Sequence, residues 1–164
     1  MGSDRVAGGL VVRPATVADV AALGTLNAAV QTLHVRAQPA EFTTPDATAA
    51  ASFFQARLAE PHVLVLLAEQ DGQGIGYLYA EEQHREGDAF TRPSNGLYIH
   101  HLGTRADWRR RGVGRTLMGA AQQHAAHRKL DVLRLSTGSF NVDAQRFFAS
   151  LGYEPYSIRL IRRL

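Results

Sequence analysis

The sequence predicts an α+β domain in which a mixed central β-sheet of six to seven strands is flanked by about four helices. Runs rich in Val, Leu, Ile and Tyr cluster between residues 63 and 104. A strand, helix, strand unit follows over residues 97–136, and parallel pairing across such a unit makes the sheet mixed. With 164 residues, of which 45% are hydrophobic, the chain can bury one core. We expect one domain over residues 10–164, preceded by a disordered tail at residues 1–9.

The first third of the chain predicts a short strand and two helices. Residues 10–13 are strand-like, and Thr16 with Asp19 forms a capping-box pattern at the start of a helix. The buried face of that helix comprises Val20, Leu23, Leu26 and Val30. A second helix is expected over residues 46–58.

A β-hairpin is expected next. Residues 63–69 and 75–82 are β-rich, and the intervening residues 71–74 read Asp-Gly-Gln-Gly. The polar residues 83–96 form either a substrate-side loop or a long surface hairpin. They lead into a strand at residues 97–104.

The last third predicts two helices and two strands. An amphipathic helix is expected from residue 113 to about 129, then a strand at residues 132–136. A shorter helix at residues 143–151 should end at Gly152, and a last strand is expected at residues 156–162. The buried helix faces comprise Val113, Leu117, Met118, Ala121 and Ala125 in the first helix, and Ala144, Phe147, Phe148 and Leu151 in the second.

Composition excludes several classes of protein. The sequence has no cysteine, which excludes disulfides, thiolate metal sites and Cys nucleophiles. The longest apolar run, residues 63–68, is too short to span a bilayer, so we expect a cytoplasmic protein without membrane contact. The net charge is only +3, and its arginine clusters lack interleaved aromatic residues, which argues against nucleic acid. His124 and His127 lie one helical turn apart without a third ligand, so we expect no metal.

The sharpest local signal is the segment Arg-Arg-Arg-Gly-Val-Gly-Arg at residues 109–115, between a strand and an amphipathic helix. A helix N-terminus offers unpaired N–H groups and the positive end of a dipole, and glycines let a phosphate approach the main chain. The segment lacks the third glycine of the dinucleotide fingerprint and the Gly-Lys-Ser/Thr of a P-loop. It therefore indicates an anion cradle of another kind, or a basic turn.

The segment matches the Arg/Gln-x-x-Gly-x-Gly/Ala motif of the GNAT superfamily at Arg109, Gly112 and Gly114, with Trp108 before it. Further segments resemble family patterns in the same order, at residues 12–19, 68–78 and 141–153. The chain therefore resembles the acyl-CoA-dependent N-acetyltransferases of this superfamily over nearly its whole length. The resemblance implies a single N-acetyltransferase domain that moves an acetyl group from the CoA thioester to a primary amine by direct attack.

The same resemblance implies that acetyl-CoA is the cosubstrate and that no metal takes part. The pyrophosphate would sit on the loop amides of residues 110–116, and the backbone of residues 102–104 would bind the pantetheine arm. Asn141 would contact the pantetheine, although Asn is also a favoured N-cap. The implied cofactor-binding residues are Leu102, Gly103, Thr104, Arg109, Arg110, Arg111, Gly112, Val113, Gly114, Arg115, Thr116, Asn141 and Phe148.

A histidine is the candidate general base. An amine with a pKa near 10 must lose a proton before it attacks, and histidine titrates in the right range. His100 and His101 are adjacent on a strand, so we expect their side chains on opposite faces and only one in the site. We choose His100, since its position resembles that of a catalytic or water-positioning Glu in many GNAT proteins. Glu81 and Glu82 are the reserve bases.

The proton donor to the leaving thiolate departs from the family pattern. Phe148 stands where the family has a tyrosine that acts as general acid. A thiol with a pKa of about 8.5 can leave as thiolate at pH 7 at a cost of about 2 kcal/mol, so the loss is tolerable. Tyr153 is the candidate donor, with Tyr156, Ser139 or water as substitutes.

The acceptor site is the least specified part. The resemblance places it along the connection between the first two helices and near the central strands, which points to His34, Phe42, Tyr79 and Glu81. The amine itself, a small molecule or a protein, is left open, as is the acyl-chain preference, and a homodimer is compatible with the resemblance. The alternative is a non-catalytic acyl-CoA-binding sensor or regulatory protein, which Phe148 favours.

Overall fold

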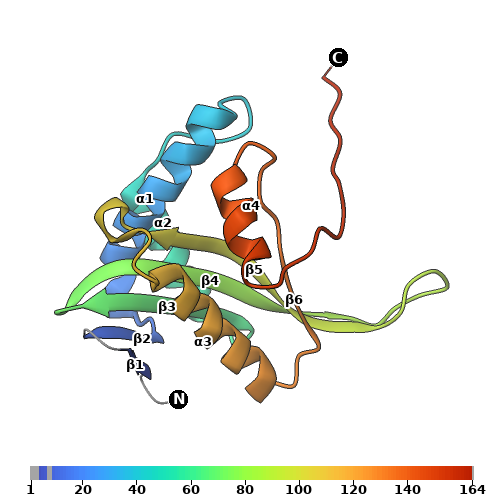
Figure 1. The fold of residues 1–164 in the computed structure, drawn as a ribbon, viewed down its shortest axis with the longest axis horizontal. Helices are drawn as coiled ribbons and strands as arrows, with labels where there is room; N and C mark the ends of the chain where they lie inside the picture. The colour runs from blue at the N-terminus through green and yellow to red at the C-terminus, as the bar shows by residue number, and fades with distance from the viewer. Residues whose placement is uncertain (1–3, 7–8, 164) are drawn as a thin grey trace.

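Six strands form one mixed sheet, in the order β1-β2-β3-β4-β5-β6, in the computed structural model, which describes residues 4–6 and 9–163 (Figure 1). Neighbouring strands are antiparallel except β5 and β6, which are parallel. The strands are β1 (Asp4–Val6), β2 (Leu10–Pro14), β3 (Val63–Gln70), β4 (Gln73–Arg85), β5 (Ser94–Thr104) and β6 (Val132–Leu135). The α+β class and the mixed sheet are confirmed. Five of these strands have four residues or more, whereas β1 has only three. The predicted number of six to seven strands is therefore reached, at its lower end, only when β1 is counted.

The four helices of the described residues cover both faces of the sheet (Figure 1). On one face lie α1 (Val20–Ala37) and α2 (Ala47–Arg57), and on the other lie α3 (Val113–His127) and α4 (Val142–Ala149). Each face buries its own apolar cluster, with Phe54 and Tyr77 fully buried on the α1/α2 side and Leu78 and Leu117 fully buried on the α3 side. No helix in this part of the chain is both long enough and apolar enough to cross a membrane.

The predicted capping box fixes the start of α1. The backbone N–H of Thr16 donates to Asp19 Oδ2 at 2.7 Å, and the 3-10 turn η1 (Val17–Asp19) leads into the helix. Arg13 of β2 donates to Asp19 at 2.8 Å and to Glu69 of β3 at 2.9 Å. The Arg13 hydrogen bond, aided by those from Thr16, holds the pKa of Asp19 well below its usual range. The network therefore ties two strands to the first helix.

The arms of the β4–β5 hairpin extend beyond the rest of the sheet (Figure 1). The sequence predicted that the strands would end at residue 82 and resume at residue 97, but pairing continues to Arg85↔Ser94. The tip is held by Asp88, which accepts hydrogen bonds from the backbone of Phe90 and Thr91. Of the two interpretations of residues 83–96, the long surface hairpin is therefore the correct one.

Both ends of the chain differ from the prediction. Residues 153–163 contain no strand, so the strand expected at 156–162 is wrong. No strand of the described chain pairs with this segment, and Ile158 and Leu160 are 85% and 93% exposed. At the other end, Asp4–Val6 pairs with β2 where a disordered tail was expected. The rest of residues 1–8 lies outside the described residues, and the domain boundary at residue 10 stays a prediction.

Two helical glycines provide a matched test of the packing. A Cβ at Gly24 of α1 would lie 2.3 Å from the carbonyl oxygen of Ala47, whereas a Cβ at Gly119 of α3 would meet nothing within 4 Å. Gly24→Ala should lower the free energy of unfolding by about 1–3 kcal/mol, because α1 and α2 must separate. Gly119→Ala should raise it by about 0.5–1 kcal/mol, the helix-propensity gain of alanine. Urea denaturation of both variants checks this pair, and equal effects would contradict the close packing of α1 on α2.

Candidate active site

The parallel strands β5 and β6 part at one end of the sheet. Their pairing runs from Gly96↔Val132 to Ile99↔Leu135, where β6 ends. β5 continues to Thr104, and in the described residues no strand follows this edge of β5 beyond Ile99. Main-chain N–H and C=O groups of residues 102–104 on this edge therefore lack a strand partner, and such groups need one when they are covered.

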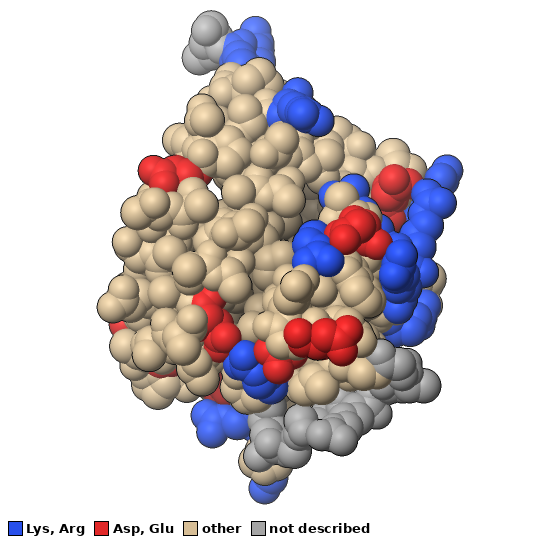
Figure 2. All heavy atoms as spheres, turned by 90° about the vertical axis from the view of Figure 1, so that its left-hand side faces the viewer, with Lys and Arg blue, Asp and Glu red and all other residues tan. Residues whose placement is uncertain are grey.

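The N-terminus of α3 and its basic loop follow directly after β5. The turn η2 (Ala106–Trp108) leads into the loop, and Gly112 caps α3 with φ 85° and no side-chain hydrogen bond. The first N–H groups of α3 therefore have no side-chain cap in this part of the chain. Four arginines of this segment are exposed: Arg109, Arg110, Arg111 and Arg115. Lys and Arg side chains gather along one side of the molecule in Figure 2. The predicted anion cradle thus has free N–H groups and positive charge at one helix end.

A contact between α3 and α4 closes the cradle from behind. A Cβ at Gly114 would lie 3.2 Å from Phe147 Cζ of α4, so glycine lets the two helices approach here. Asn141 caps α4 by accepting the backbone N–H of Ala144 at 3.2 Å. Phe148 packs on the α3-side core, and its ring centroid lies 5.8 Å from that of Tyr153.

The phenol group of Tyr153, beside Phe148, makes no hydrogen bond to the described residues. Its hydroxyl oxygen is buried and has no hydrogen-bond partner among the described residues. Burial raises the pKa of Tyr153 above its ordinary value, so the phenol stays neutral at physiological pH. A buried hydroxyl without a partner is uncommon, which marks it as a potential donor to a ligand.

A β-bulge in β5 turns both histidines to one face. Tyr79 of β4 pairs with His101 and Ala80 pairs with Ile99, which leaves His100 as the extra residue. The Tyr79 ring centroid lies 4.9 Å from that of His100 and 5.4 Å from that of His101. The prediction that the two side chains point to opposite faces is therefore wrong, because the bulge interrupts the alternation of an ideal strand.

Glu81 gathers three side chains on this face. The Tyr79 hydroxyl donates to Glu81 Oε1, His100 Nε2 lies 3.3 Å from Oε2, and Arg57 of α2 lies 3.8 Å from Oε1. Burial acts to raise the pKa of Glu81, but the Tyr79 hydrogen bond and the charge of His100 outweigh it, so this pKa lies below its ordinary value. Burial and the adjacent carboxylate raise the pKa of Tyr79. Glu81 is therefore ionised and Tyr79 is a neutral phenol at neutral pH.

His100 is held between tyrosine rings yet stays accessible. It stacks on Tyr79 with an interplanar angle of 20°, and the Tyr98 ring centroid lies 4.8 Å away. Phe53 of α2 lies edge-on to Tyr79 at 5.6 Å. The His100 side chain keeps 30% of its surface exposed, so a ligand can reach it.

His101 is the more buried histidine. Its Nδ1 lies 3.4 Å from the amide nitrogen of Asn27, which also donates to the Tyr77 hydroxyl at 2.9 Å. Burial, with smaller effects from His100 and His34, lowers the pKa of His101 to about 4. His101 is therefore neutral at pH 7 and is a weak base.

A second aromatic group lies beside His101. His34 of α1 lies 4.8 Å from Phe42 in the α1–α2 connection and 5.7 Å from Phe140 before α4, measured between ring centroids. Burial lowers the pKa of His34, and its Nδ1 is buried without a partner in the described chain. The predicted acceptor residues thus fall into two groups, His34 with Phe42 and Tyr79 with Glu81.

Glu82, a reserve base, lies on the opposite face. It accepts hydrogen bonds from Arg128 at 2.8 and 3.0 Å and lies 3.1 Å from His124 Nε2, both on the α3 side. Its 8% exposure leaves it no access to the Glu81 cluster. Among the described residues, no three His, Asp or Glu side chains lie close enough to hold a metal ion.

Sequence reasoning missed four residues of the site. Tyr98 shares the face of His100 by its two-residue spacing and could have been found by that signal. Arg57, Phe53 and Phe140 reach the site through the packing of α2 and of the segment before α4, for which no sequence signal exists.

Comparison with known proteins assigns the family. The family model described as "Acetyltransferase (GNAT) family" matches residues 27–153, which is most of the chain. The chain belongs to the GNAT family of acetyltransferases. The resemblance to this family seen in the sequence is thereby confirmed.

The individual relatives agree with this assignment. An uncharacterized N-acetyltransferase of Archaeoglobus fulgidus is 31% identical over 99 residues, which cover 60% of this chain and 65%, less than two thirds, of that relative. A tetramutant of the BH1408 protein from Bacillus halodurans has the same fold, with a TM-score of 0.88 and 24% identity over 93% of this chain and 99% of that chain. The aminoglycoside N-acetyltransferase AAC(6')-Iy in complex with CoA matches with a TM-score of 0.77 and 18% identity over 100% of this chain and 97% of that chain.

The buried, neutral His101 predicts a pH-dependent stability. In the unfolded chain a histidine has a pKa near 6.5, whereas the pKa of folded His101 is about 4. Between these two values the unfolded state binds one more proton than the folded state, so the free energy of unfolding decreases as the pH is lowered. From pH 7.5 to pH 5.0 the wild type should lose about 2 kcal/mol more than His101→Gln. Urea unfolding at both pH values measures this difference, with the exposed His127→Gln as control. Equal losses for wild type and His101→Gln would contradict a neutral buried His101.

Proposed function

We propose that the protein transfers the acetyl group of acetyl-CoA to a primary amine by direct attack. The observation that carries this proposal is that three parts meet where β5 and β6 separate. These parts are the free edge of β5, the basic N-terminus of α3, and the pair formed by His100 and Glu81. Membership of the GNAT family supports acetyl-CoA as the donor, and the CoA complex of a fold neighbour is consistent with it.

Acetyl-CoA would lie along the edge of β5. Its pyrophosphate would bind the free N–H groups and arginines at the start of α3, since a helix N-terminus favours an anion. The pantetheine amides would pair with the backbone of residues 102–104, and Asn141 and Phe148 would flank the arm. A backbone N–H near Leu102 would polarise the thioester carbonyl. The fit of a phosphate is supported by Gly112, where a Cβ would meet nothing within 4 Å, so that no side chain stands at the N-cap of α3.

His100 is the proposed general base. With its Nε2–H toward Glu81, the Nδ1 lone pair of His100 would accept a proton from the acceptor ammonium, and the neutral amine would then attack the thioester carbonyl. The ionised Glu81 would then stabilise the imidazolium that forms, so its role is to orient and stabilise His100. Tyr79 keeps the carboxylate in place through its hydrogen bond.

Tyr153 is the proposed proton donor to the leaving thiolate. Its hydroxyl is buried, protonated and without a partner in the described chain, and it lies beside Phe148, which cannot donate. The acceptor would enter on the α1/α2 side, between the His34 and Phe42 group and the Tyr79 and Glu81 group. The competing candidate is an acyl-CoA-binding protein without turnover, which Phe148 in the place of a tyrosine favours.

Acetyl-CoA binding should depend on the charge of the cradle. The double variant Arg109→Glu, Arg110→Glu should weaken binding by about tenfold or more, because two anions replace two cations beside the pyrophosphate. The variant Arg159→Glu, Arg162→Glu makes the same change of net charge in the exposed C-terminal segment and should bind as the wild type does. Isothermal titration with acetyl-CoA measures both. No binding by the wild type would overturn the proposed function.

Turnover should depend on His100. With an amine panel that includes an aminoglycoside, His100→Gln should lower kcat about 100-fold or more, the usual contribution of a general base. Its acetyl-CoA Kd should stay that of the wild type, and the exposed His127→Gln should retain full activity. Release of free CoA thiol measures turnover. Acetyl-CoA binding by the wild type without turnover of any amine would favour the sensor.

A further inference from the structure

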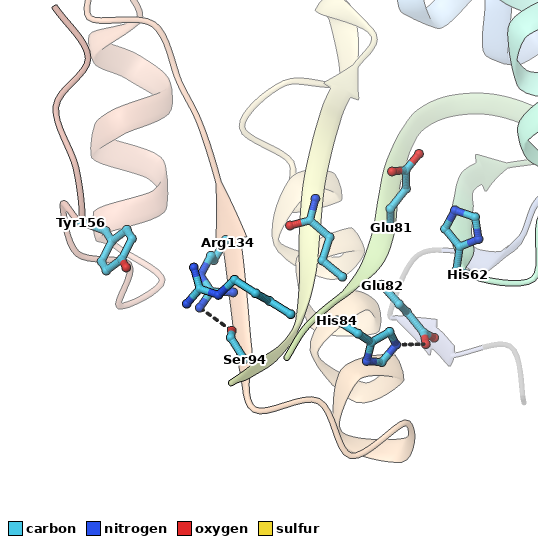
Figure 3. A pocket seen from close by; sticks show the side chains of 9 residues that line it. His62, Glu81, Glu82, His84, Ser94, Arg134 and Tyr156 are labelled. Carbon is cyan, nitrogen blue, oxygen red and sulfur yellow. Dashed lines mark hydrogen bonds and ion pairs between the residues drawn. The ribbon is translucent and has the colours of Figure 1, made fainter. Parts of the chain in front are cut away.

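A groove of about 580 Å³ opens beside Glu81, on a part of the sheet that lies beyond α1 and α2 (Figure 3). It is floored by the extended arms of β4 and β5 and by β6, and Tyr156 of the C-terminal segment stands at its rim. In Figure 3, Glu81 and His62 lie at one end, and Arg134 with Ser94 lies at the other. Its size suits a small organic ligand.

The pairing register places three residues of opposite character in one row. Glu81 of β4 lies opposite Tyr98 of β5, and Tyr98 lies opposite Arg134 of β6. Residues directly opposite share one face of a sheet, and neighbouring strands are about 4.8 Å apart, so the backbones of Glu81 and Arg134 are about 10 Å apart. The carboxylate of Glu81 and the guanidinium of Arg134 therefore lie in one row, on either side of Tyr98.

Gly96 lies in the next row toward the hairpin tip, beside Arg134. It lies between Gln83 of β4 and Val132 of β6, and it contributes no side chain to the floor. A Cβ at this position would lie 3.1 Å from a terminal nitrogen of Arg134, so the guanidinium extends over the glycine. The positive charge therefore faces the groove.

Neither arginine of the groove is in close contact with a carboxylate of the described residues, although Arg85 acts at longer range on Asp88. Arg134 donates to Ser94 Oγ at 2.8 Å, and Arg85 donates to the carbonyl oxygen of Arg92 at 3.2 Å. Neither forms an ion pair with a described carboxylate, whereas Glu82 of the same stretch is held on the opposite face by Arg128. Each guanidinium has five N–H groups, so most of its donors remain available.

We propose that this groove binds a carboxylate on the acceptor, so that the acceptor is an amine that also carries an acid group. The inference rests on the proposed function and specifies its substrate class. The amine would lie at Glu81 and His100, and the carboxylate would lie at Arg134, whose planar guanidinium suits two-point binding of a carboxylate. Glu82 also lines the groove but is already paired with Arg128, so the two arginines of the groove would repel a polycation there. The proposed acceptor therefore differs in charge from an aminoglycoside.

The test compares matched acceptors. A series of ω-amino carboxylic acids of increasing length is assayed beside the corresponding neutral ω-amino amides. For the best length, kcat/KM of the acid should exceed that of its amide by about tenfold or more, the usual scale of a charge-assisted contact. In Arg134→Gln the ratio of acid to amide should fall to about one, while the Kd for acetyl-CoA is that of the wild type. Arg146→Gln, which removes an exposed arginine of α4, should keep the wild-type ratio.

Several results would overturn the inference. Equal kcat/KM values for acids and amides, or the wild-type ratio of acid to amide in Arg134→Gln, would show that Arg134 does not bind the carboxylate of the acceptor. An ω-amino phosphonate preferred over the carboxylate would show that the anion is a phosphoryl group. If no acid is acetylated, and no N-acetylated acid binds in the presence of CoA, the groove is not an acceptor site. If the wild type does not bind acetyl-CoA in the titration, the proposed function itself is refuted.

Discussion

The separation of β5 from β6 is the constraint on which the rest of the structure depends. A parallel pair that ends at Ile99 while β5 runs on to Thr104 leaves main-chain groups without a strand partner among the described residues. Such groups are stable only against solvent or a ligand that supplies amides of its own. The bulged histidines lie on β5 directly after Ile99, and the basic start of α3 follows the end of this strand. In the proposed function, this opening is where the acetyl donor and the acceptor would meet from opposite faces of the sheet.

The charges around the opening are divided between its two sides. Exposed arginines gather at the start of α3, where the proposed function places a phosphate and where Gly112 offers no side-chain cap. The proposed acceptor side has one ionised carboxylate, Glu81, among aromatic rings. Tyr79 and His100 satisfy Glu81, so it is more suited to hold an imidazole than to bind several ammonium groups. Farther along the same face the sign changes at Arg134. This order of charges, acid first and arginine second, distinguishes the acceptor side from a plain acidic pocket.

Most of the fold follows from periodicity that the sequence displays openly. The helices, the hairpin at Asp71 and the cap at Thr16 depend on local chemistry, and each was predicted to within a few residues. The bulge was not, because adjacent His100 and His101 look like ordinary strand alternation and only the pairing with Tyr79 and Ala80 reveals the extra residue. The strand predicted at residues 156–162 was wrong because an alternating pattern alone does not make a strand. Among the described residues no strand lies beside this segment to pair with it. The row of Glu81, Tyr98 and Arg134 requires the register of three strands and could not be read from the sequence.

The bulge also separates two parts of β5 that can change independently. On one side of it the hairpin arms can gain or lose residues in matched pairs, and the row from Glu81 to Arg134 keeps its alignment, because β6 fixes it. On the other side, residues 102–104 keep their position relative to α3 whatever happens at the hairpin tip. Loss of one residue at the bulge itself would restore ideal pairing, with the remaining histidine opposite Tyr79, and would leave one histidine on this face instead of two. Variation in length is therefore tolerated at residues 86–93, whereas a deletion at the two histidine positions would keep the strand pairing and still remove a residue of the site.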